Sequence, residues 1–422
     1  MKRSTLPIVF LIIFLDMLGF GLIIPILPAY IGWFGAGPLA YGVVLASYSL
    51  MQLIFSPLWG RLSDRIGRRP VVLISVVGSV LGFTLMGVAR TFLMLLLSRV
   101  ITGIMNSNIA AAQSIIADIT PPRDRAKRMG LTGVAFGLGF VFGPALGGIL
   151  SRFSSWGPGF LVRAGEALVG GSAQRLDFGA PAMFAAMLSV VSLVLAATLL
   201  PETNPEHLRS TARSAGPRAW LAAVSRRDVG VLIVLFFFST LAQSISTSMI
   251  PLFLKEHSAQ YGFRPDRVAE NTGYLMAFVG VMVAITQGGI IRPLLKVLRE
   301  PWLIVAGMLL MAISLVWLPY SPSIPILMGS LLFLAVGSGI GTPSLTSLIS
   351  RRTDAAMQGV VLGAAQSMSS FARFLGPLWG GVTHERLGHA APYVSGGIFM
   401  VLAFIISLTA LRPAAVPVHA EE

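Results

Sequence analysis

The sequence predicts an all-α polytopic membrane protein in which twelve helices cross a bilayer. Of the 422 residues, 55% are hydrophobic and only 11% are charged, whereas soluble globular proteins average about 25% charged residues. The apolar residues also gather in runs of about 20, the length that a helix needs to cross the hydrocarbon core. These two observations exclude an ordinary soluble protein.

Each apolar run is expected to form one transmembrane helix. The first run follows Lys2 and Arg3, as in a secretory signal, but no small-residue cleavage pattern comes after it, so we expect it to remain as the first span. The even number of runs places both termini on the same side of the membrane. The predicted spans cover about 7–31, 40–60, 70–90, 92–118, 129–151, 180–200, 229–254, 272–291, 302–320, 324–349, 357–382 and 391–411.

The placement of the basic residues predicts the orientation of the chain. The net charge is +14, and most of the 31 Lys and Arg residues fall in alternate connections, together with the N-terminus and the end of the last span. The positive-inside rule assigns these connections to the cytoplasm. We therefore predict a multi-pass protein of the cell inner (plasma) membrane with both termini cytoplasmic. The positive charge does not indicate nucleic acid as a partner.

The spans divide into two halves of six. Residues 1–200 form the predicted N-terminal bundle, 201–228 a flexible cytoplasmic linker, and 229–422 the C-terminal bundle. One glycine template recurs in spans 5 and 11, which run in the same direction, as in transporters built from two parallel repeats. The template is Gly130-x8-Gly139-x3-Gly143-Pro144-x2-Gly147-Gly148, and its copy is Gly363-x8-Ala372-x3-Gly376-Pro377-x2-Gly380-Gly381. The long outer connection 152–179 is expected to hold a short surface helix.

A short charged connection at 60–70 separates spans 2 and 3. Gly60 and Gly67 are expected to remove side chains where helices meet or where the backbone turns tightly. Asp64 can face the positive N-terminal end of a helix, which is worth roughly 0.3–1 kcal/mol at an exposed end. The alternative for the arginines of this segment is that they only set the orientation. A second connection, 287–293 after span 8, is predicted to be a loop that carries a degenerate copy of the segment 60–70.

Four motifs make the chain resemble the major facilitator superfamily, and within it the twelve-span drug:proton antiporters that include the tetracycline exporters. They are the connection at 60–69, the glycine template at 130–148, Arg99-x3-Gly103 in span 4, and the segment from Asp16 to Pro28 in span 1. The resemblance implies the major facilitator fold, in which two pseudo-symmetric six-helix bundles move against each other around a midplane site.

The resemblance also implies roles for two of these motifs. The charged connection would form a cytoplasmic gate that holds the outward-open state against helix 11, and its residues are Gly60, Asp64, Gly67, Arg68 and Asp118. The antiporter motif of span 5 would seal the route between the halves, and its residues are Gly130, Gly139, Gly143, Pro144, Gly147 and Gly148. The alternative for the second motif is plain close packing of helices.

Asp16 is the candidate for proton coupling. At about 1.5 Å per residue it lies about 14 Å into span 1, where an acid costs roughly 2.5–3.5 kcal/mol on insertion scales and is a functional candidate by default. By resemblance, Arg99 assists by shifting the pKa of a neighbouring acid. The alternatives are a structural ion pair between Asp16 and Arg99, or hydrogen bonds to backbone groups.

Three polar side chains are candidates for the substrate cavity: Asn106, Gln243 and Arg373. By resemblance, helices 1, 4, 7 and 10 line this cavity, which favours Asn106 and Gln243. Arg373 lies in the middle of span 11, where it can pair with Asp16 or meet an anionic group of the substrate. Interhelical hydrogen bonds are the alternative for Asn106 and Gln243, and a snorkelling or packing role is the alternative for Arg373.

The sequence therefore predicts a proton-coupled secondary transporter that exports a small drug-like or amphiphilic organic compound by alternating access. Span 9 lacks the carboxylate that tetracycline exporters carry there, which favours a neutral, amphiphilic or anion-bearing compound. The alternatives are a lipid or lysolipid carrier, an uncoupled facilitator and, last, a non-transporting receptor. No metal-ligand cluster, nucleophile triad or phosphate-binding loop indicates an enzyme. The expected partners of the monomeric chain are its substrate, protons and lipid, with a proton gradient in place of a cofactor.

Overall fold

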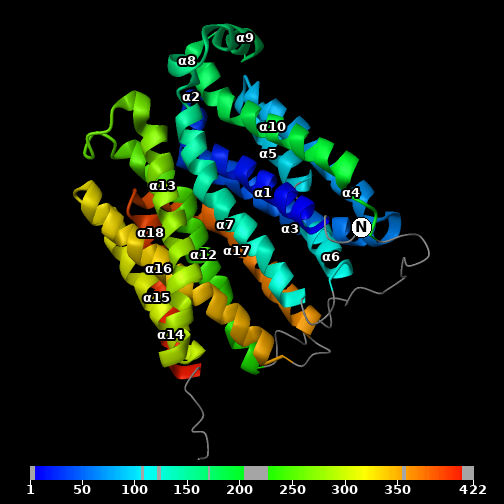
Figure 1. Cartoon of the computed structure of the whole chain (residues 1–422). Coiled ribbons are helices and arrows are strands. Elements are labelled where there is room, and N and C mark those ends of the chain that lie inside the picture. Colours follow the sequence, from blue (N-terminus) through cyan, green and yellow to red (C-terminus); the bar gives the residue numbers. More distant parts are fainter. Residues whose placement is uncertain are drawn as a thin grey trace, which may run out of the picture. The chain divides into compact units, whose positions relative to one another are not determined.

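The computed structural model describes residues 5–105, 109–120, 125–169, 172–203, 227–353 and 358–410. Within these ranges the protein is built of helices and contains no strand (Figure 1). Nine helices of the described part are long and apolar enough to cross a membrane, and two more apolar helices are shorter. The predicted all-α class is thus confirmed, whereas the number of twelve spans stays a prediction.

The helices of the first half follow the predicted spans closely. In chain order they are α1 (Thr5–Ile23), α2 (Leu27–Trp33), α3 (Pro38–Ile66), α4 (Arg68–Gly87), α5 (Phe92–Met105), α6 (Ile109–Asp118), α7 (Arg125–Leu150), α8 (Phe153–Trp156), α9 (Gly159–Val169) and α10 (Ala173–Leu199). Helices α8 and α9 confirm the short helix expected in the connection 152–179.

The second half is also helical. Its elements are α12 (Arg227–Glu256), a 3-10 turn (Pro265–Arg267), α13 (Val268–Ile285), a π-helical turn (Thr286–Ile290), α14 (Ile291–Val297), α15 (Glu300–Trp317), a 3-10 turn (Leu318–Tyr320), α16 (Ile324–Arg351), α17 (Gln358–Leu387) and α18 (Ala391–Ala410). The expectation of a loop at 287–293 is wrong, because the π-helical turn continues α13 into α14.

The first predicted span is not one helix. A turn at 24–26 separates α1 from α2. Pro25 has no N–H to donate to the preceding turn, and a second proline, Pro28, stands in the first turn of α2, where proline is tolerated. Pro251 in span 7, in contrast, remains inside α12. The prolines of spans 1 and 7 therefore have different consequences for the backbone.

The expectation that residues 60–70 form a loop is also wrong. Helix α3 continues through the charged segment to Ile66, and α4 begins at Arg68. Gly67 alone makes the connection, with a φ of 107° that favours glycine. Gly60 lies inside α3, and a Cβ built there would meet nothing within 4 Å. The positive φ therefore accounts for glycine at position 67, whereas crowding does not account for glycine at position 60.

Contacts between Cα atoms divide the chain into two compact units. Unit 1 comprises 1–214, 247–281 and 373–392, and unit 2 comprises 215–246, 282–372 and 393–422. These boundaries are not those of the predicted sequence repeat. The proposed division around the linker 201–228 remains a prediction, and residues 204–226 lie outside the described part.

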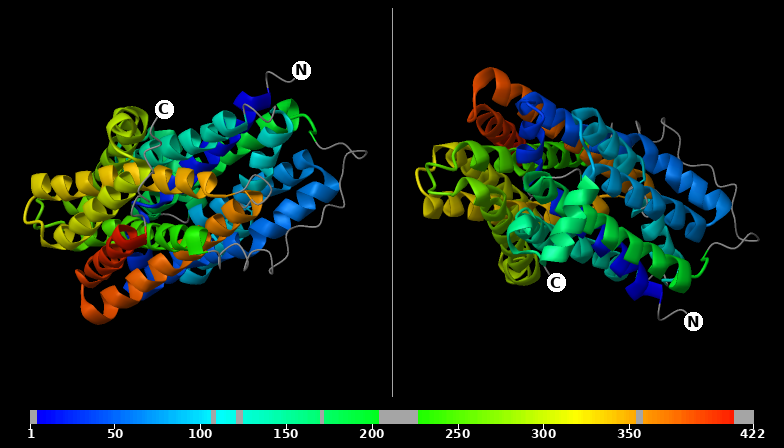
Figure 2. Two further views of the ribbon diagram at one scale, coloured as in Figure 1. Left: turned by 90° about the horizontal axis from the view of Figure 1, so that it is seen from below. Right: turned by 90° about the horizontal axis from the view of Figure 1, so that it is seen from above.

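Unit 1 is built around α1. This helix packs against α7 and α10, while α4 packs against α5 and α10, and α3 lies beside α5 (Figures 1 and 2). Buried aliphatic side chains of α1, α4 and α6 form its core, among them Ile13, Val76 and Ile115. We call the end of unit 1 where α1, α7 and α12 terminate the distal end. The end with Gly67 is the proximal end.

Unit 2 has its closest helix pair in α15 and α16. Glycines face each other at their contact: a Cβ on Gly307 would lie 2.8 Å from the carbonyl oxygen of Gly337 and 2.9 Å from the Cα of Gly341. Small residues at such a contact let two backbones approach closely, as is typical of helix pairs in membranes.

Candidate functional site

The antiporter motif of α7 forms a glycine seam against α1. A Cβ on Gly143 would lie 2.7 Å from the Cα of Gly21, and one on Gly147 would overlap the carbonyl oxygen of Leu22. Gly139 is equally crowded, by Met17. Any side chain at these positions would separate the helices, so the motif sets the distance between α7 and α1.

The same motif also faces α13 within unit 1. A Cβ on Gly148 would lie 2.8 Å from the carbonyl oxygen of Ala269, and Gly273 packs against the carbonyl of Pro144. Helix α7 is thus wedged between α1 and α13 with no side chain between the backbones at these points. Gly130 lies in the first turns of α7.

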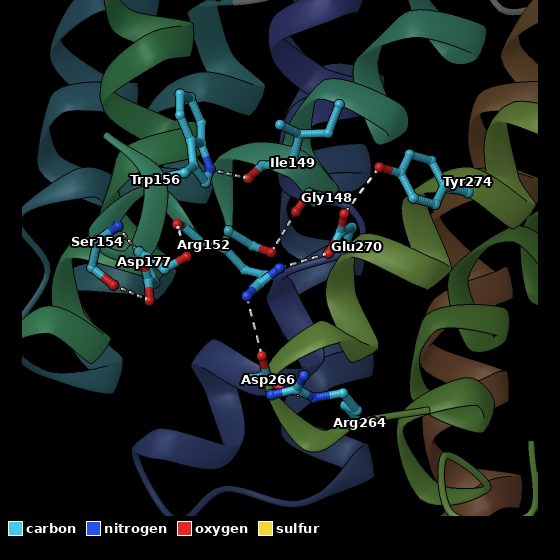
Figure 3. Close-up of polar contacts among 12 residues, drawn as sticks. Gly148, Ile149, Arg152, Ser154, Trp156, Asp177, Arg264, Asp266, Glu270 and Tyr274 are labelled. Atoms are coloured by element: carbon cyan, nitrogen blue, oxygen red, sulfur yellow. Dashed lines mark hydrogen bonds and ion pairs between the residues drawn. The ribbon is translucent and has the colours of Figure 1, made fainter. Parts of the chain in front are cut away.

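An ion-pair network closes the distal end of this seam (Figure 3). Arg152, four residues beyond Gly148, lies 3.3 Å from Asp266 through one terminal nitrogen and 3.3 Å from Glu270 through the other. The Tyr274 hydroxyl donates a hydrogen bond of 3.0 Å to Glu270. Ion pairs therefore hold α7 and α13 together directly beyond the last glycine of the seam.

Sequence reasoning missed this network. Arg152 lies in a predicted outer connection, and Asp266 and Glu270 precede the predicted start of span 8. The available signal was their spacing: acids four residues apart lie on one face of a helix. No pattern near these two acids indicates that their partner is an arginine more than a hundred residues earlier in the chain.

Asp177 anchors the short helix α8 to α10 at the same end. Its carboxylate accepts hydrogen bonds of 2.7 Å from both the backbone N–H and the hydroxyl of Ser154 (Figure 3). The indole N–H of Trp156 donates to the carbonyl of Ile149 at 3.1 Å. These bonds hold the chain that follows the antiporter motif against α10.

Two buried charged residues lie in the interior of unit 1. Asp16 in α1 is 3% exposed and Arg99 in α5 is 1% exposed. The Arg99 guanidinium carbon lies 6.0 Å from the ring centroids of both Phe20 and Tyr48. Within the described part of the chain, none of its three nitrogens has a hydrogen-bond partner.

The suggested structural ion pair of Asp16 with Arg99 is therefore wrong for this conformation, because the described neighbours of Arg99 are aromatic rings. Phe20 nevertheless follows Asp16 by four residues and so lies on the same face of α1. Phe20, one of the two rings that Arg99 faces, is thus one helical turn from the acid.

The three cavity candidates are in different places. Arg373, in α17, is half-buried in unit 1 and interacts electrostatically with Tyr48, the ring that also faces Arg99. Gln243 is half-buried in the part of α12 that belongs to unit 2. Asn106 lies outside the described residues. Their roles in a cavity remain predictions.

The predicted gate residues meet at the proximal end of unit 1. Arg68 lies 2.6 Å from Asp64 and 3.2 Å from Asp118, and it also donates a 2.6 Å hydrogen bond to the hydroxyl of Ser63. The three charged residues therefore form one network, as the resemblance implied. The predicted contact with the start of span 11 stays a prediction, since 354–357 lie outside the described part.

Glu202 completes this network and was not singled out from the sequence. Its two carboxylate oxygens accept the backbone N–H groups of Arg68 at 2.8 Å and of Arg69 at 3.1 Å. These are the first residues of α4, whose N–H groups have no partner within the helix. A carboxylate from a point more than a hundred residues later thus caps the helix that carries the gate arginine.

We expect Glu202→Ala to lower the free energy of unfolding by about 1 kcal/mol, the usual effect of removing a helix cap. Glu202→Gln retains one acceptor oxygen and should lose less. Thermal unfolding of the purified variants in one detergent measures both. Equal midpoints for Glu202→Ala and the unchanged chain would contradict the capping role.

A cluster of histidines lies at the ends of α12 and α17. His257 and His389 have ring centroids 4.5 Å apart, and His384 lies 2.9 Å from the carboxylate of Glu256. The Phe253 ring stacks on His257. No set of three His, Asp or Glu side chains in the described residues is arranged to hold a metal ion.

Partial burial, followed by the nearby charge of His257, lowers the pKa of His389 below its ordinary 6.5. The unfolded chain then binds this proton more readily than the folded one. The free energy of unfolding therefore has its full value above about pH 6.5 and decreases as the pH falls below that value. We expect the thermal midpoint to fall between pH 7.5 and pH 5.5, and to fall less in His389→Gln.

The matched control for that experiment is Arg386→Gln, which removes an exposed charge at the same end of α17. It should retain the full fall in midpoint on acidification. A fall in His389→Gln as large as in the unchanged chain would show that His389 is not its cause.

The family model of the Major Facilitator Superfamily matches residues 9–377 and 288–421. The chain belongs to the major facilitator superfamily. Among curated proteins it is 33% identical over 382 residues to the class E tetracycline resistance protein of Escherichia coli, covering 89% of this chain and 87% of that protein.

Two further members of the superfamily resemble the chain along its length. The class G tetracycline resistance protein of Vibrio anguillarum is 31% identical over 421 residues, covering 97% of this chain and 98% of that protein. The crystal structure of the human organic anion transporter MFSD10 (TETRAN) aligns with a TM-score of 0.67 at 23% identity, covering 96% and 99% of the two chains. The chain is thus a multi-pass membrane transporter whose relatives include tetracycline efflux proteins.

Proposed function

We propose that the chain exports a small organic compound across the cell inner membrane in exchange for protons, by alternating access. The observation that carries this proposal is Asp16, a carboxylate only 3% exposed inside a membrane helix that is held by the antiporter motif. An ionisable group at such a depth is costly and marks a proton or substrate pathway by default. The tetracycline resistance relatives support export of a drug-like compound.

In this mechanism Asp16 binds and releases the proton. Arg99 modulates this step: its guanidinium faces the rings of Phe20 and Tyr48, and Phe20 lies one turn along α1 from the acid. Approach of this buried cation to Asp16 would favour the ionised acid and release the proton, and withdrawal would favour uptake. A small shift between α1 and α5 would therefore change the affinity of Asp16 for its proton.

Unit 1 supplies both a gate and a seal for this cycle. The network of Asp64, Arg68 and Asp118 is the proposed cytoplasmic gate, and the glycine seam of α7 with α1 and α13 is the proposed seal between the two sides. With the predicted orientation, the proximal end faces the cytoplasm and the distal end faces outward. A proton gradient would supply the energy, and no cofactor is needed.

Transport by purified chain in liposomes tests the proposal. A susceptibility panel in an efflux-deficient host first selects the compound, with tetracycline and anionic amphiphiles among those tried. Uptake of that compound is then measured with and without a pH gradient. We expect uptake to depend on the gradient. Equal rates under both conditions would indicate an uncoupled facilitator, and binding without uptake would indicate a receptor.

A further inference from the structure

A cavity of about 710 Å³ opens at the distal end of unit 1. Its volume lies in the range of sites that enclose drug-sized ligands, about 300–1,000 Å³. Much of the lining is apolar and comes from the turn after α1, from α10 and from α12, including Ile26, Phe178 and Pro251. Four charged side chains also line it, and three of them are already engaged.

The engaged charges are two acids and one arginine. Arg152 is shared between Asp266 and Glu270, each at 3.3 Å. Asp266 also lies 3.2 Å from Arg264, a residue that does not line the cavity. Asp177 accepts two hydrogen bonds of 2.7 Å from Ser154. These groups hold the walls of the cavity together and leave little capacity for a ligand (Figure 3).

Lys255 is the fourth charged group and has a different environment. The residue is half-buried, and its ammonium donates one hydrogen bond of 2.9 Å to the carbonyl oxygen of Pro28. Among the described residues, no acid lies within ion-pair distance of it. An ammonium group has three donors. Two of them are therefore left for a partner in the cavity.

The neighbouring backbone makes room for this ammonium. A Cβ built on Gly32 would lie 2.5 Å from the Lys255 nitrogen. The glycine therefore lets the lysine stretch over α2 to the carbonyl of Pro28. The ammonium is thus held at one position beside an apolar wall, which is the combination that recognises the charged end of an amphiphile.

We propose that this cavity binds a carboxylate-bearing amphiphile, with the carboxylate on Lys255 and the apolar body against Ile26, Phe178 and Pro251. In the transport cycle it would hold the compound on the distal side of the glycine seam, and in this respect the inference rests on the proposed export. Binding itself requires no transport. A loss of binding and a loss of export are therefore separate results.

Equilibrium binding of 2-naphthoate to the purified full chain in a neutral detergent, followed by calorimetry, tests this site. The neutral 2-naphthamide and a cationic naphthylmethylammonium are the matched ligands. We expect 2-naphthoate to bind most tightly, and Lys255→Met to weaken it at least about tenfold, as for loss of a hydrogen bond to a charged group. Lys255→Met should leave the affinity for 2-naphthamide nearly unchanged.

Two control variants locate the site. Arg163→Met removes an exposed cation of α9 that is not in the lining, and it should bind 2-naphthoate as the unchanged chain does. Arg373→Met tests binding in the interior instead. Loss of binding in Arg373→Met but not in Lys255→Met would overturn the proposal. So would equal affinity for the three ligands, or no binding of 2-naphthoate at millimolar concentration.

Discussion

Asp16→Asn is expected to reduce gradient-driven export to the level of protein-free liposomes. Asparagine has nearly the same shape as aspartate and does not titrate, so the substitution removes the proton site without opening a cavity. Asp16 is 3% exposed, and replacing a buried ionisable group by a neutral one should not lower the thermal midpoint strongly. Binding of the exported compound, measured without a gradient, should persist.

The control is Glu166→Gln, which neutralises a carboxylate on the short helix α9. It should transport like the unchanged chain. If Asp16→Asn kept gradient-driven export, the proton would have to be carried elsewhere, and the proposed role of Asp16 would be wrong. A loss of both binding and thermal stability in Asp16→Asn would indicate a structural role instead.

Gly147→Ala should destabilise the protein more than any other single methyl group added to α7. The new Cβ would overlap the carbonyl oxygen of Leu22, which is backbone and cannot rotate away. Overpacking of this kind costs about 1–3 kcal/mol. In domains of about 150–250 residues, each kcal/mol lowers the thermal midpoint by about 2–4 °C. Thermal unfolding in detergent measures the effect.

Gly137→Ala provides the matched comparison in the same helix. A Cβ there would meet nothing within 4 Å, so the variant should be as stable as the unchanged chain or more stable by about 0.5–1 kcal/mol, the helix penalty of glycine. If the seam also seals the membrane, liposomes with Gly147→Ala should leak protons faster than those with Gly137→Ala. Equal stability of the two variants would contradict the close contact of α7 with α1.

Several features of this protein follow from the sequence alone. Apolar runs of about 20 residues predict membrane helices because the bilayer core demands that length, and the protein has helices at each predicted span. The motifs were also enough to indicate the family, because the glycine template and the segment 60–69 are local patterns that can be recognised without the fold. The crowding of Gly139, Gly143 and Gly147 against α1 agrees with the packing alternative for that template.

Local expectations failed where a neighbouring residue or helix decided the backbone. Helix α3 runs on through the charged segment to Ile66, because arginine and leucine are good helix formers and only Gly67 interrupts them. Pro25 breaks the first span whereas Pro251 does not. A proline removes the same N–H in both places, and the surrounding packing determines whether the helix continues.

The partners of charged groups were decided by the tertiary structure. Arg152 meets Glu270, Glu202 caps α4, and Lys255 reaches Pro28, in each case across more than a hundred residues of chain. A periodic pattern indicates which face of a helix is apolar, but it does not indicate which other helix packs against that face. The sequence therefore determined the class, the family and the candidate acid Asp16, and only folding placed the charges that fasten the two ends of unit 1.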